Sequence, residues 1–244
     1  MLLNKESDNL LNYDAQFLSF ENNSLIGVDE AGRGALAGPV AAGAVWISAE
    51  FLKQHQRDPN ILLIQDSKQL SAKRRLQAFE WLQVWQKEGG LRFASAEGSV
   101  TEIDVGNIAY ATKLAFRRVL ETIQSLAHLT LNNTTNAHFI NAPQVLIDGY
   151  HLKNFAYDHK NIVKGDQKSF CIAAASIVAK VTRDFLMEQL SVRYPYYYLS
   201  INKGYGTRQH RHALVRYGAS DMHRRSFLSK ILSDPTHWQG ELHL

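Results

Sequence analysis

The sequence predicts an α/β fold in which helices cover a mixed sheet, followed by a small helical region near the C-terminal end. Three observations support this prediction. Short apolar runs typical of strands alternate with longer segments of helical periodicity, and several of those runs lead into an acidic residue and a glycine. Beyond Pro195 the composition becomes aromatic and basic.

The predicted strands are short, apolar and bounded by residues that favour turns. Residues 24–28 lie between two asparagines and a glycine-rich loop, and residues 39–47 combine small and β-branched side chains. A third strand is predicted over 91–96, and residues 144–149 and 162–166 repeat the pattern of an apolar run that leads to an acid. Acids at strand ends face the crevice in which α/β folds bind their ligands.

The predicted helices are recognised by their periodicity and by the residues at their ends. Residues 71–87 begin at Ser71, a residue type that caps helices, and repeat apolar side chains at helical spacing. Residues 107–126 are rich in alanine and leucine, and residues 169–193 carry an early run of alanines that allows close approach to a sheet. A short helix is expected over 207–217.

The composition is that of a globular protein, with 244 residues of which 45% are hydrophobic and 20% charged. No run approaches the roughly 20 apolar residues needed to cross a bilayer, and no secretory signal is recognisable at the start. We therefore expect a soluble, cytoplasmic protein without membrane association. The single cysteine, Cys171, has apolar neighbours and is predicted to be a buried small hydrophobe. The polar segment 129–142 is expected to form a surface loop or insertion and receives no role.

Positive charge gathers near the C-terminal end. The formal net charge is +4, and residues 201–230 contain seven lysines and arginines against one acid, Asp221. A cluster of this kind favours a polyanionic partner such as nucleic acid. The alternative interpretation is a solvated helical face.

Four acids lie at or after the ends of predicted strands, namely Asp29, Glu30, Asp148 and Asp166. Consecutive strand residues point to opposite faces, so Asp29 and Glu30 serve one site only if the strand ends there and the chain bends. Four carboxylates in one cleft repel one another unless cations neutralise them. Oxygen ligands select Mg²⁺ or Mn²⁺, and two such ions can activate a water and stabilise the leaving oxygen in phosphodiester cleavage.

Other functions compete with this hypothesis. A two-carboxylate glycosidase explains neither four acids nor the basic C-terminal segment. A cysteine hydrolase is disfavoured because Cys171 has no local activating charge. A nucleic-acid-binding module without cleavage activity, in which the acids are structural, stays open as the alternative.

Several motifs resemble those of the ribonuclease HII family, in family order from about residue 25 to 228. The first is Gly27-Val28-Asp29-Glu30-Ala31-Gly32-Arg33-Gly34 with Leu36-Ala37-Gly38-Pro39-Val40 after it. The next are Asp66-Ser67-Lys68, Ile147-Asp148-Gly149, Lys164-Gly165-Asp166 and the segment from Ala174 to Asp184. The last are Lys203-Gly204-Tyr205-Gly206-Thr207 and His223-Arg224-Arg225-Ser226-Phe227.

The resemblance implies an RNase H-like catalytic domain over 23–193, preceded by an N-terminal extension over 1–22. A helical substrate-binding region would follow over 194–244. It further implies an endonuclease, expected to be monomeric, that cuts 5′ to ribonucleotides in RNA–DNA hybrids and at single ribonucleotides in duplex DNA. Cleavage would leave a 3′-hydroxyl and a 5′-phosphate and would support ribonucleotide removal from DNA.

Residue roles also follow from the resemblance. The four acids Asp29, Glu30, Asp148 and Asp166 would be catalytic and would bind two Mg²⁺ or Mn²⁺ ions in the substrate complex. The loop Gly32-Arg33-Gly34 would inspect the ribose 2′-hydroxyl through its backbone, and Tyr205 would pack on the sugar that follows the ribonucleotide. Phosphate contacts are expected from four further residues, Ser67, Lys68, Lys180 and Arg183.

Overall fold

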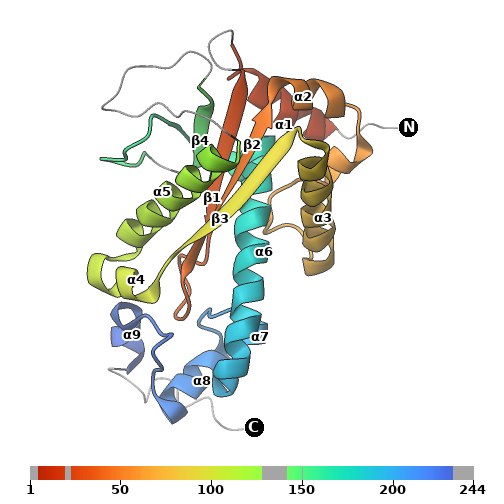
Figure 1. Cartoon of the computed structure of the whole chain (residues 1–244). Coiled ribbons are helices and arrows are strands. Elements are labelled where there is room, and N and C mark those ends of the chain that lie inside the picture. Colours follow the sequence, from red (N-terminus) through yellow and green to blue (C-terminus); the bar gives the residue numbers. More distant parts are fainter. Residues whose placement is uncertain (1–4, 20–22, 128–141, 150, 233–244) are drawn as a thin grey trace.

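A five-stranded mixed sheet forms the centre of the computed structural model, which describes residues 5–19, 23–127, 142–149 and 151–232. The strands are β1 (Ser24–Ala31), β2 (Val40–Ser48), β3 (Leu91–Gly98), β4 (Gln144–Asp148) and β5 (Lys160–Ile162), in the order β3-β2-β1-β4-β5. β1 pairs antiparallel with β2 and parallel with β4. The predicted mixed sheet covered by helices is therefore confirmed (Figure 1).

The long helix α6 (Phe170–Arg193) crosses one face of the sheet at close range. A β-carbon on Gly43 of β2 would lie 2.3 Å from the carbonyl oxygen of Ala175, so only glycine permits this approach. The helices α1 (Lys5–Ala15), α2 (Ala49–His55) and α3 (Ala72–Glu88) share the same apolar core with α6. Ser71 caps α3 through its side chain, as its position in the sequence predicts.

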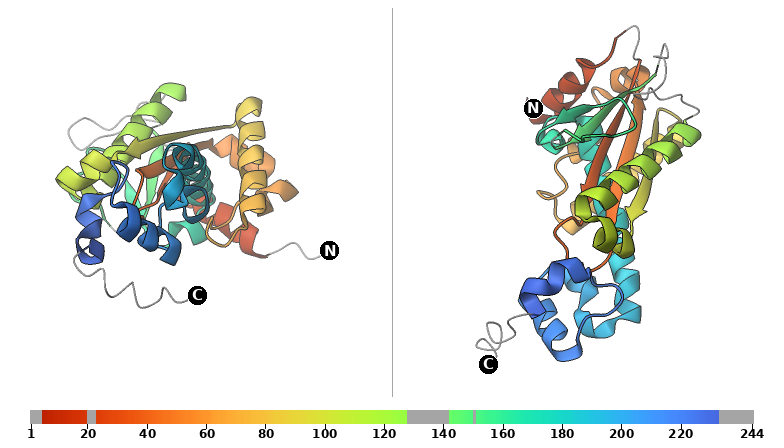
Figure 2. Two further views of the ribbon diagram at one scale, coloured as in Figure 1. Left: turned by 90° about the horizontal axis from the view of Figure 1, so that it is seen from below. Right: turned by 90° about the vertical axis from the view of Figure 1, so that its left-hand side faces the viewer.

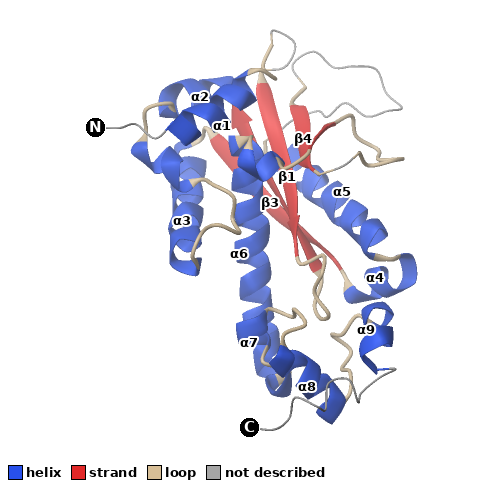
Figure 3. Ribbon diagram, turned by 180° about the vertical axis from the view of Figure 1, so that it is seen from behind, coloured by secondary structure: helices blue, strands red, loops and turns tan. Residues whose placement is uncertain are grey.

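The opposite face of the sheet is covered by α5 (Ile108–Leu126), which follows the short helix α4 (Val100–Gly106). Phe116, Val119 and Leu120 of α5 pack there against Ile26 and Val28 of β1. Figure 3, seen from behind, shows α6 in front of the sheet and α5 running beside the strands. Helices thus bury the sheet on both faces, as an α/β layer architecture requires.

The C-terminal helices form a small region beyond one end of the sheet, where α6 extends past the strands (Figure 2, right). They are α7 (Leu199–Asn202), α8 (Arg208–Tyr217) and α9 (Arg225–Leu232). A separate apolar cluster holds them to the loop after β1, and it includes Ala37, Met187 and Leu214. The carboxylate of Asp104 in α4 accepts hydrogen bonds from the first amides of α9, which ties this region to the main body.

Two local predictions differ from the structure. The first strand does not end before the acids but continues through Ala31. The last strand covers only Lys160–Ile162, and Asp166 lies on the 3₁₀ turn η2 (Gly165–Gln167) that precedes α6. Most of segment 129–142 lies outside the described residues. Among those that are described, the structure contains no helix long and apolar enough to cross a membrane.

Candidate metal centre and substrate-reading loop

Three carboxylates meet at the centre of the sheet, beside the start of α6. The β1–β4 register pairs Val28 with Ile147, so Asp29 and Asp148 occupy the next row of two parallel strands and point to the same face. Asp166 joins them from η2, whose Gly165 amide donates a 2.6 Å hydrogen bond to Asp148. One oxygen from each carboxylate lies within 4.8 Å of the others. We call Asp29, Asp148 and Asp166 the acid triad.

Burial and mutual repulsion make this triad electrostatically unfavourable without a cation. Burial raises the pKa of Asp29 well above its usual range, and the neighbouring Glu30 and Asp148 raise it further. Burial also raises the pKa of Asp166, although Lys68 opposes this effect. Within the described part of the chain, Asp29 Oδ2 is buried and has no hydrogen-bond partner. A set of oxygen donors with one orphaned oxygen fits a hard divalent cation such as Mg²⁺ or Mn²⁺.

Glu30 stands outside the triad, although it was expected to converge with the other acids. Because β1 continues through Ala31, Asp29 and Glu30 point to opposite faces of the strand. The Glu30 carboxylate instead accepts a 3.2 Å hydrogen bond from Arg33. Burial raises the pKa of Glu30, and Arg33 partly offsets this. The structure thus brings three of the four predicted acids together and leaves the fourth beside them.

Lys68 is the cation that the structure places at the triad. Its Nζ lies 3.2 Å from Asp166 Oδ2, and the lysine side chain is 72% exposed. Burial lowers the pKa of Lys68, but the carboxylates of Asp166 and Asp29 outweigh this and raise it above its usual value. Lys68 can therefore balance the acids while its ammonium group stays accessible to a phosphate.

The neighbouring Ser67 faces the interior. Its hydroxyl lies 2.7 Å from the hydroxyl of Ser176 on α6, and the Ser67 residue is only 2% exposed. Ser176 in turn contacts Asp29 and opposes the rise of its pKa. Ser67 therefore contacts the triad only indirectly, through Ser176. Because its hydroxyl is buried, the expected direct contact between Ser67 and a phosphate is corrected.

Two buried arginines donate hydrogen bonds to backbone carbonyls of the loop after β1. Arg183 of α6 donates to the carbonyls of Pro39, Lys203 and Ala37 at 3.1, 2.8 and 3.2 Å. Arg224 donates to the carbonyls of Gly38 and Arg33 at 2.9 and 2.8 Å. Gly32 is buried against Arg183 with a φ of +90°, whereas Arg33 and Gly34 are exposed and a β-carbon on Gly34 would meet nothing within 4 Å.

Arg183 is fully buried, which corrects the expectation that it contacts a substrate phosphate. Its guanidinium is committed to backbone carbonyls and lies 5.4 Å from the ring centroid of Tyr205. Lys180 is partly exposed and forms an ion pair with Asp184. Tyr205 itself is 38% exposed, so one part of its ring rests on Arg183 while another part stays open to a ligand.

Two features near the site were not predicted from the sequence. Arg224 and the buried pair His210 and His223 support the loop and Tyr205, yet the sequence indicated them only as members of the basic cluster within 201–230. The only signal was the motif from His223 to Phe227, which does not by itself separate structural from substrate-contacting side chains. The sequence does not show which of these side chains are buried. A buried arginine must donate its hydrogen bonds to acceptors within the protein.

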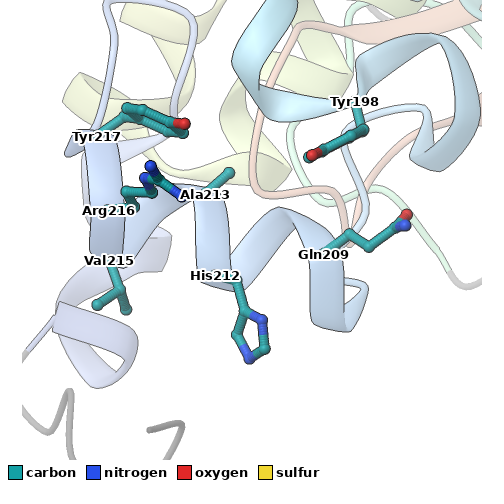
Figure 4. Close-up of a pocket in the computed structure, with 7 residues that line it drawn as sticks. All are labelled: Tyr198, Gln209, His212, Ala213, Val215, Arg216 and Tyr217. Atoms are coloured by element: carbon teal, nitrogen blue, oxygen red, sulfur yellow. The ribbon is translucent and has the colours of Figure 1, made fainter. Parts of the chain in front are cut away.

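A surface pocket of about 400 Å³ lies apart from these residues, on α8. Figure 4 shows its lining side chains, among them Tyr198, His212 and Tyr217. None of its lining residues belongs to the acid triad or to the loop after β1. The pocket therefore adds no group to the chemistry described above.

Sequence comparison identifies close relatives. Residues 26–230 match the family model described as Ribonuclease HII. The chain is 40% identical to a ribonuclease HII of Clostridium beijerinckii over 228 residues, which cover 93% of this chain and 75% of that protein. It is 36% identical to a ribonuclease HII of Caldicellulosiruptor bescii over 93% of this chain and 98% of that protein.

Solved structures share the fold at lower identity. Ribonuclease H2 of Pyrococcus horikoshii superposes with a TM-score of 0.62 at 22% identity, covering 88% of this chain and 99% of that one. A Bst-RNase HIII in complex with Mn²⁺ gives a TM-score of 0.61 at 16% identity over 90% of this chain and 72% of that one. The ribonuclease HII of a PCNA complex from Archaeoglobus fulgidus gives 0.59 at 21% identity, covering 82% and 93%.

Proposed function

This chain belongs to the ribonuclease HII family and is a metal-dependent ribonuclease H of type II; on that premise we propose which bonds it cuts and which residues do so. The proposed reaction hydrolyses the phosphodiester 5′ to a ribonucleotide. The substrates are RNA–DNA hybrids and duplex DNA that contains single ribonucleotides. The products carry a 3′-hydroxyl and a 5′-phosphate, and the proposed biological role is removal of ribonucleotides from DNA.

The acid triad is the observation that carries this proposal. Asp29, Asp148 and Asp166 would hold the metal. Glu30 lies outside this group, but Asp148 and Lys68 both affect its pKa, and in this proposal it joins the metal-binding set in the substrate complex. Two divalent ions, when bound, supply an activated water and neutralise the charge that develops on the leaving oxygen. The chain's own contribution is to hold the carboxylates on two paired strands and on the turn before α6, so that little reorganisation is needed during the reaction.

Recognition of the ribonucleotide is assigned to the loop after β1 and to Tyr205. The 2′-hydroxyl distinguishes RNA from DNA, and it can both donate and accept a hydrogen bond. The contact to this hydroxyl is assigned to the backbone of Gly32, Arg33 and Gly34. Arg33 and Gly34 are exposed and Gly34 has no side chain to obstruct the approach, while the buried Gly32 forms the turn at positive φ. The exposed part of the Tyr205 ring would pack on the following sugar. Part of the recognition would thus follow directly after Asp29 and Glu30 in the chain.

Phosphate contacts are assigned to the accessible lysines. Lys68 would move from Asp166 to a substrate phosphate once metal neutralises the acids, and Lys180 would contribute from α6. The basic C-terminal helices would add attraction for the duplex backbone. A monomeric state and a cytoplasmic location stay predictions.

The test is a cleavage assay on a DNA duplex bearing one ribonucleotide, with Mg²⁺, with Mn²⁺ and with a chelator. Asp29→Asn and Asp166→Asn should abolish cleavage while leaving duplex binding largely intact. Glu80→Gln, a matched change of an exposed acid on α3, serves as the control and should cleave normally.

The outcomes separate the proposal from its alternative. Cleavage 5′ to the ribonucleotide that requires metal supports the proposed reaction. Binding without cleavage under every metal condition would instead favour a nucleic-acid-binding module. Near wild-type cleavage by Asp29→Asn would reject the role of the triad.

A further inference from the structure

Two buried histidines join the C-terminal helices to the loop after β1. His210 on α8 is 0% exposed and His223, just before α9, is 1% exposed. Their Nε2 atoms lie 3.0 Å apart. A contact between two imidazole nitrogens is a hydrogen bond only if one nitrogen carries a proton and the other does not.

Backbone groups at both ends decide where the protons lie. The amide of Ser220 can only donate, and it lies 3.0 Å from His223 Nδ1, which must therefore accept. The carbonyl of Tyr205 can only accept, and it lies 3.0 Å from His210 Nδ1, which must therefore donate. In the neutral pair, His223 then carries its proton on Nε2 and donates to Nε2 of His210. This is the one arrangement of neutral rings that satisfies every contact.

The surroundings keep both rings neutral. A second proton on either ring would occupy a nitrogen that already accepts a hydrogen bond. Burial lowers the pKa of His210 and lowers the pKa of His223 to about 4, where the neighbouring His210 adds to the effect and Asp221 opposes it. Tyr197 packs over the His223 ring with centroids 4.6 Å apart and excludes solvent. The hydrogen bonds are therefore maintained at neutral pH.

The pair connects the backbone of Tyr205 to the loop after β1. At one end, the Tyr205 carbonyl accepts from Thr207 at 2.8 Å as well as from His210. At the other end, His223 forms a β-bridge with Ala37, and the next residue, Arg224, donates its amide to the carbonyl of Leu36. The histidine pair thus links the Tyr205 carbonyl to the loop at Leu36 and Ala37, beside the hydrogen bonds that the amides of Leu36 and Ala37 donate to the carbonyl of Gly204.

We infer that His210 and His223 act as positioning residues, forming a neutral hydrogen-bonded relay that orients Tyr205 relative to the loop after β1. The inference rests on the proposed function, in which Tyr205 packs on the sugar that follows the ribonucleotide. Selectivity for a single embedded ribonucleotide depends on that orientation more than cleavage of a continuous hybrid does. A continuous hybrid presents a ribonucleotide at every position of its RNA strand, so a misplaced Tyr205 ring should reduce the rate of cleavage less on that substrate.

The test measures kcat/KM on a duplex that contains one ribonucleotide and kcat/KM on a continuous hybrid. The quantity compared between variants is the ratio of the first value to the second. His210→Phe keeps an aromatic ring but removes both hydrogen bonds of His210. It should lower the ratio roughly threefold to tenfold, the range expected for loss of the one neutral hydrogen bond that reaches the Tyr205 carbonyl. His210→Asn keeps a donor near the Tyr205 carbonyl and should restore most of the ratio. His212→Phe is the matched control, since His212 lies two residues along the same helix, at the pocket of Figure 4.

Tyr205→Ala separates the inference from the proposed function. If this variant leaves the ratio unchanged, the assigned role of Tyr205 is wrong. If it lowers the ratio while a folded His210→Phe variant does not, the relay alone is rejected. In the double variant, His210→Phe should have no further effect on the ratio, because it acts through Tyr205.

A second measurement does not depend on the variants folding. Long-range ¹H–¹⁵N spectra of the wild-type protein report which ring nitrogens carry protons. The relay requires the proton of His210 on Nδ1 and that of His223 on Nε2. A protonated Nε2 on His210 at neutral pH would overturn it.

Discussion

Gly32 and Arg183 are packed so closely that a β-carbon on Gly32 would lie 1.9 Å from Nε of the arginine. The arginine cannot give way easily, because its guanidinium is buried and bonded to three backbone carbonyls. Gly32 also has a φ of +90°, which disfavours any other residue. The conformation of the proposed recognition loop is thus determined by a side chain from the middle of α6.

Gly32→Ala should therefore displace the loop. We expect a loss of stability of at least about 2 kcal/mol, from strain at positive φ and from disturbed hydrogen bonds of Arg183. Denaturant unfolding measures this change. Gly34→Ala is the matched stability control, since a β-carbon there meets nothing within 4 Å. Equal stability losses in the two variants would contradict the packing argument.

Lys68 and Arg183 should differ in how they affect binding to a duplex. Lys68→Ala should reduce the slope of log Kd against log salt by about one, because one phosphate contact is lost. Arg183→Met should leave the slope unchanged and lower the melting temperature, because methionine carries no charge and cannot donate to the three carbonyls. Binding titrations at several salt concentrations, with thermal melts, check both expectations. A reduced slope in a folded Arg183→Met variant would restore the phosphate role that the burial of Arg183 argues against.

Metal binding should stabilise the folded protein through the acid triad. Adding Mg²⁺ or Mn²⁺ should raise the melting temperature of the wild type, since a ligand that binds only the folded state stabilises it. In chelator, Asp29→Asn should melt higher than the wild type, because it replaces a carboxyl group whose pKa is raised by burial and by the neighbouring Glu30 and Asp148. Adding metal should also raise the melting temperature of this variant by less than that of the wild type. If metal shifts both proteins equally, Asp29 is not a ligand.

Asp14 should make stability depend on pH independently of catalysis. Its carboxylate on α1 accepts a 2.8 Å hydrogen bond from the amide of Cys171, and burial raises its pKa to about 7. From about pH 4 to pH 7 the folded state retains a proton that the unfolded state has released. Stability from this group is thus present at low pH and is lost as pH rises through 7.

Asp14→Asn should remove this part of the pH dependence. The loss between pH 4 and pH 7 is on the order of 4 kcal/mol for a shift of this size. Urea unfolding of both proteins across that range measures the difference. The proposal for Asp14 fails if the two stability profiles stay parallel from pH 4 to pH 8.

Much of the fold could be predicted because the signals are local. The helix over 71–87 begins at a capping serine and repeats its apolar residues, and the structure has α3 at Ala72–Glu88 with Ser71 as the cap. Cys171, predicted to be a buried hydrophobe, is buried in the core. The strand predicted over 162–166 fared less well, since β5 spans only Lys160–Ile162 and Asp166 belongs to the turn after it.

The site was predicted less completely, and the misses share one cause. Ser67 and Arg183 carry groups suited to phosphate, yet both are buried and contact other parts of the protein. Residue type and motif do not reveal burial, which depends on segments more than a hundred positions apart. His210 and His223 were counted only as part of a basic cluster for the same reason.

The sequence by itself determined the alternation of strands and helices, the identity of the acids and the family. These depend on short-range periodicity and on motifs that remain recognisable without coordinates. Only the tertiary structure decided that Asp29 turns toward the triad while Glu30 turns away, and that Arg183 holds the loop. The physical reason is that the two faces of a strand become different environments only when a partner strand and α6 pack against it. A buried guanidinium such as that of Arg183 then donates to the backbone carbonyls that packing places around it.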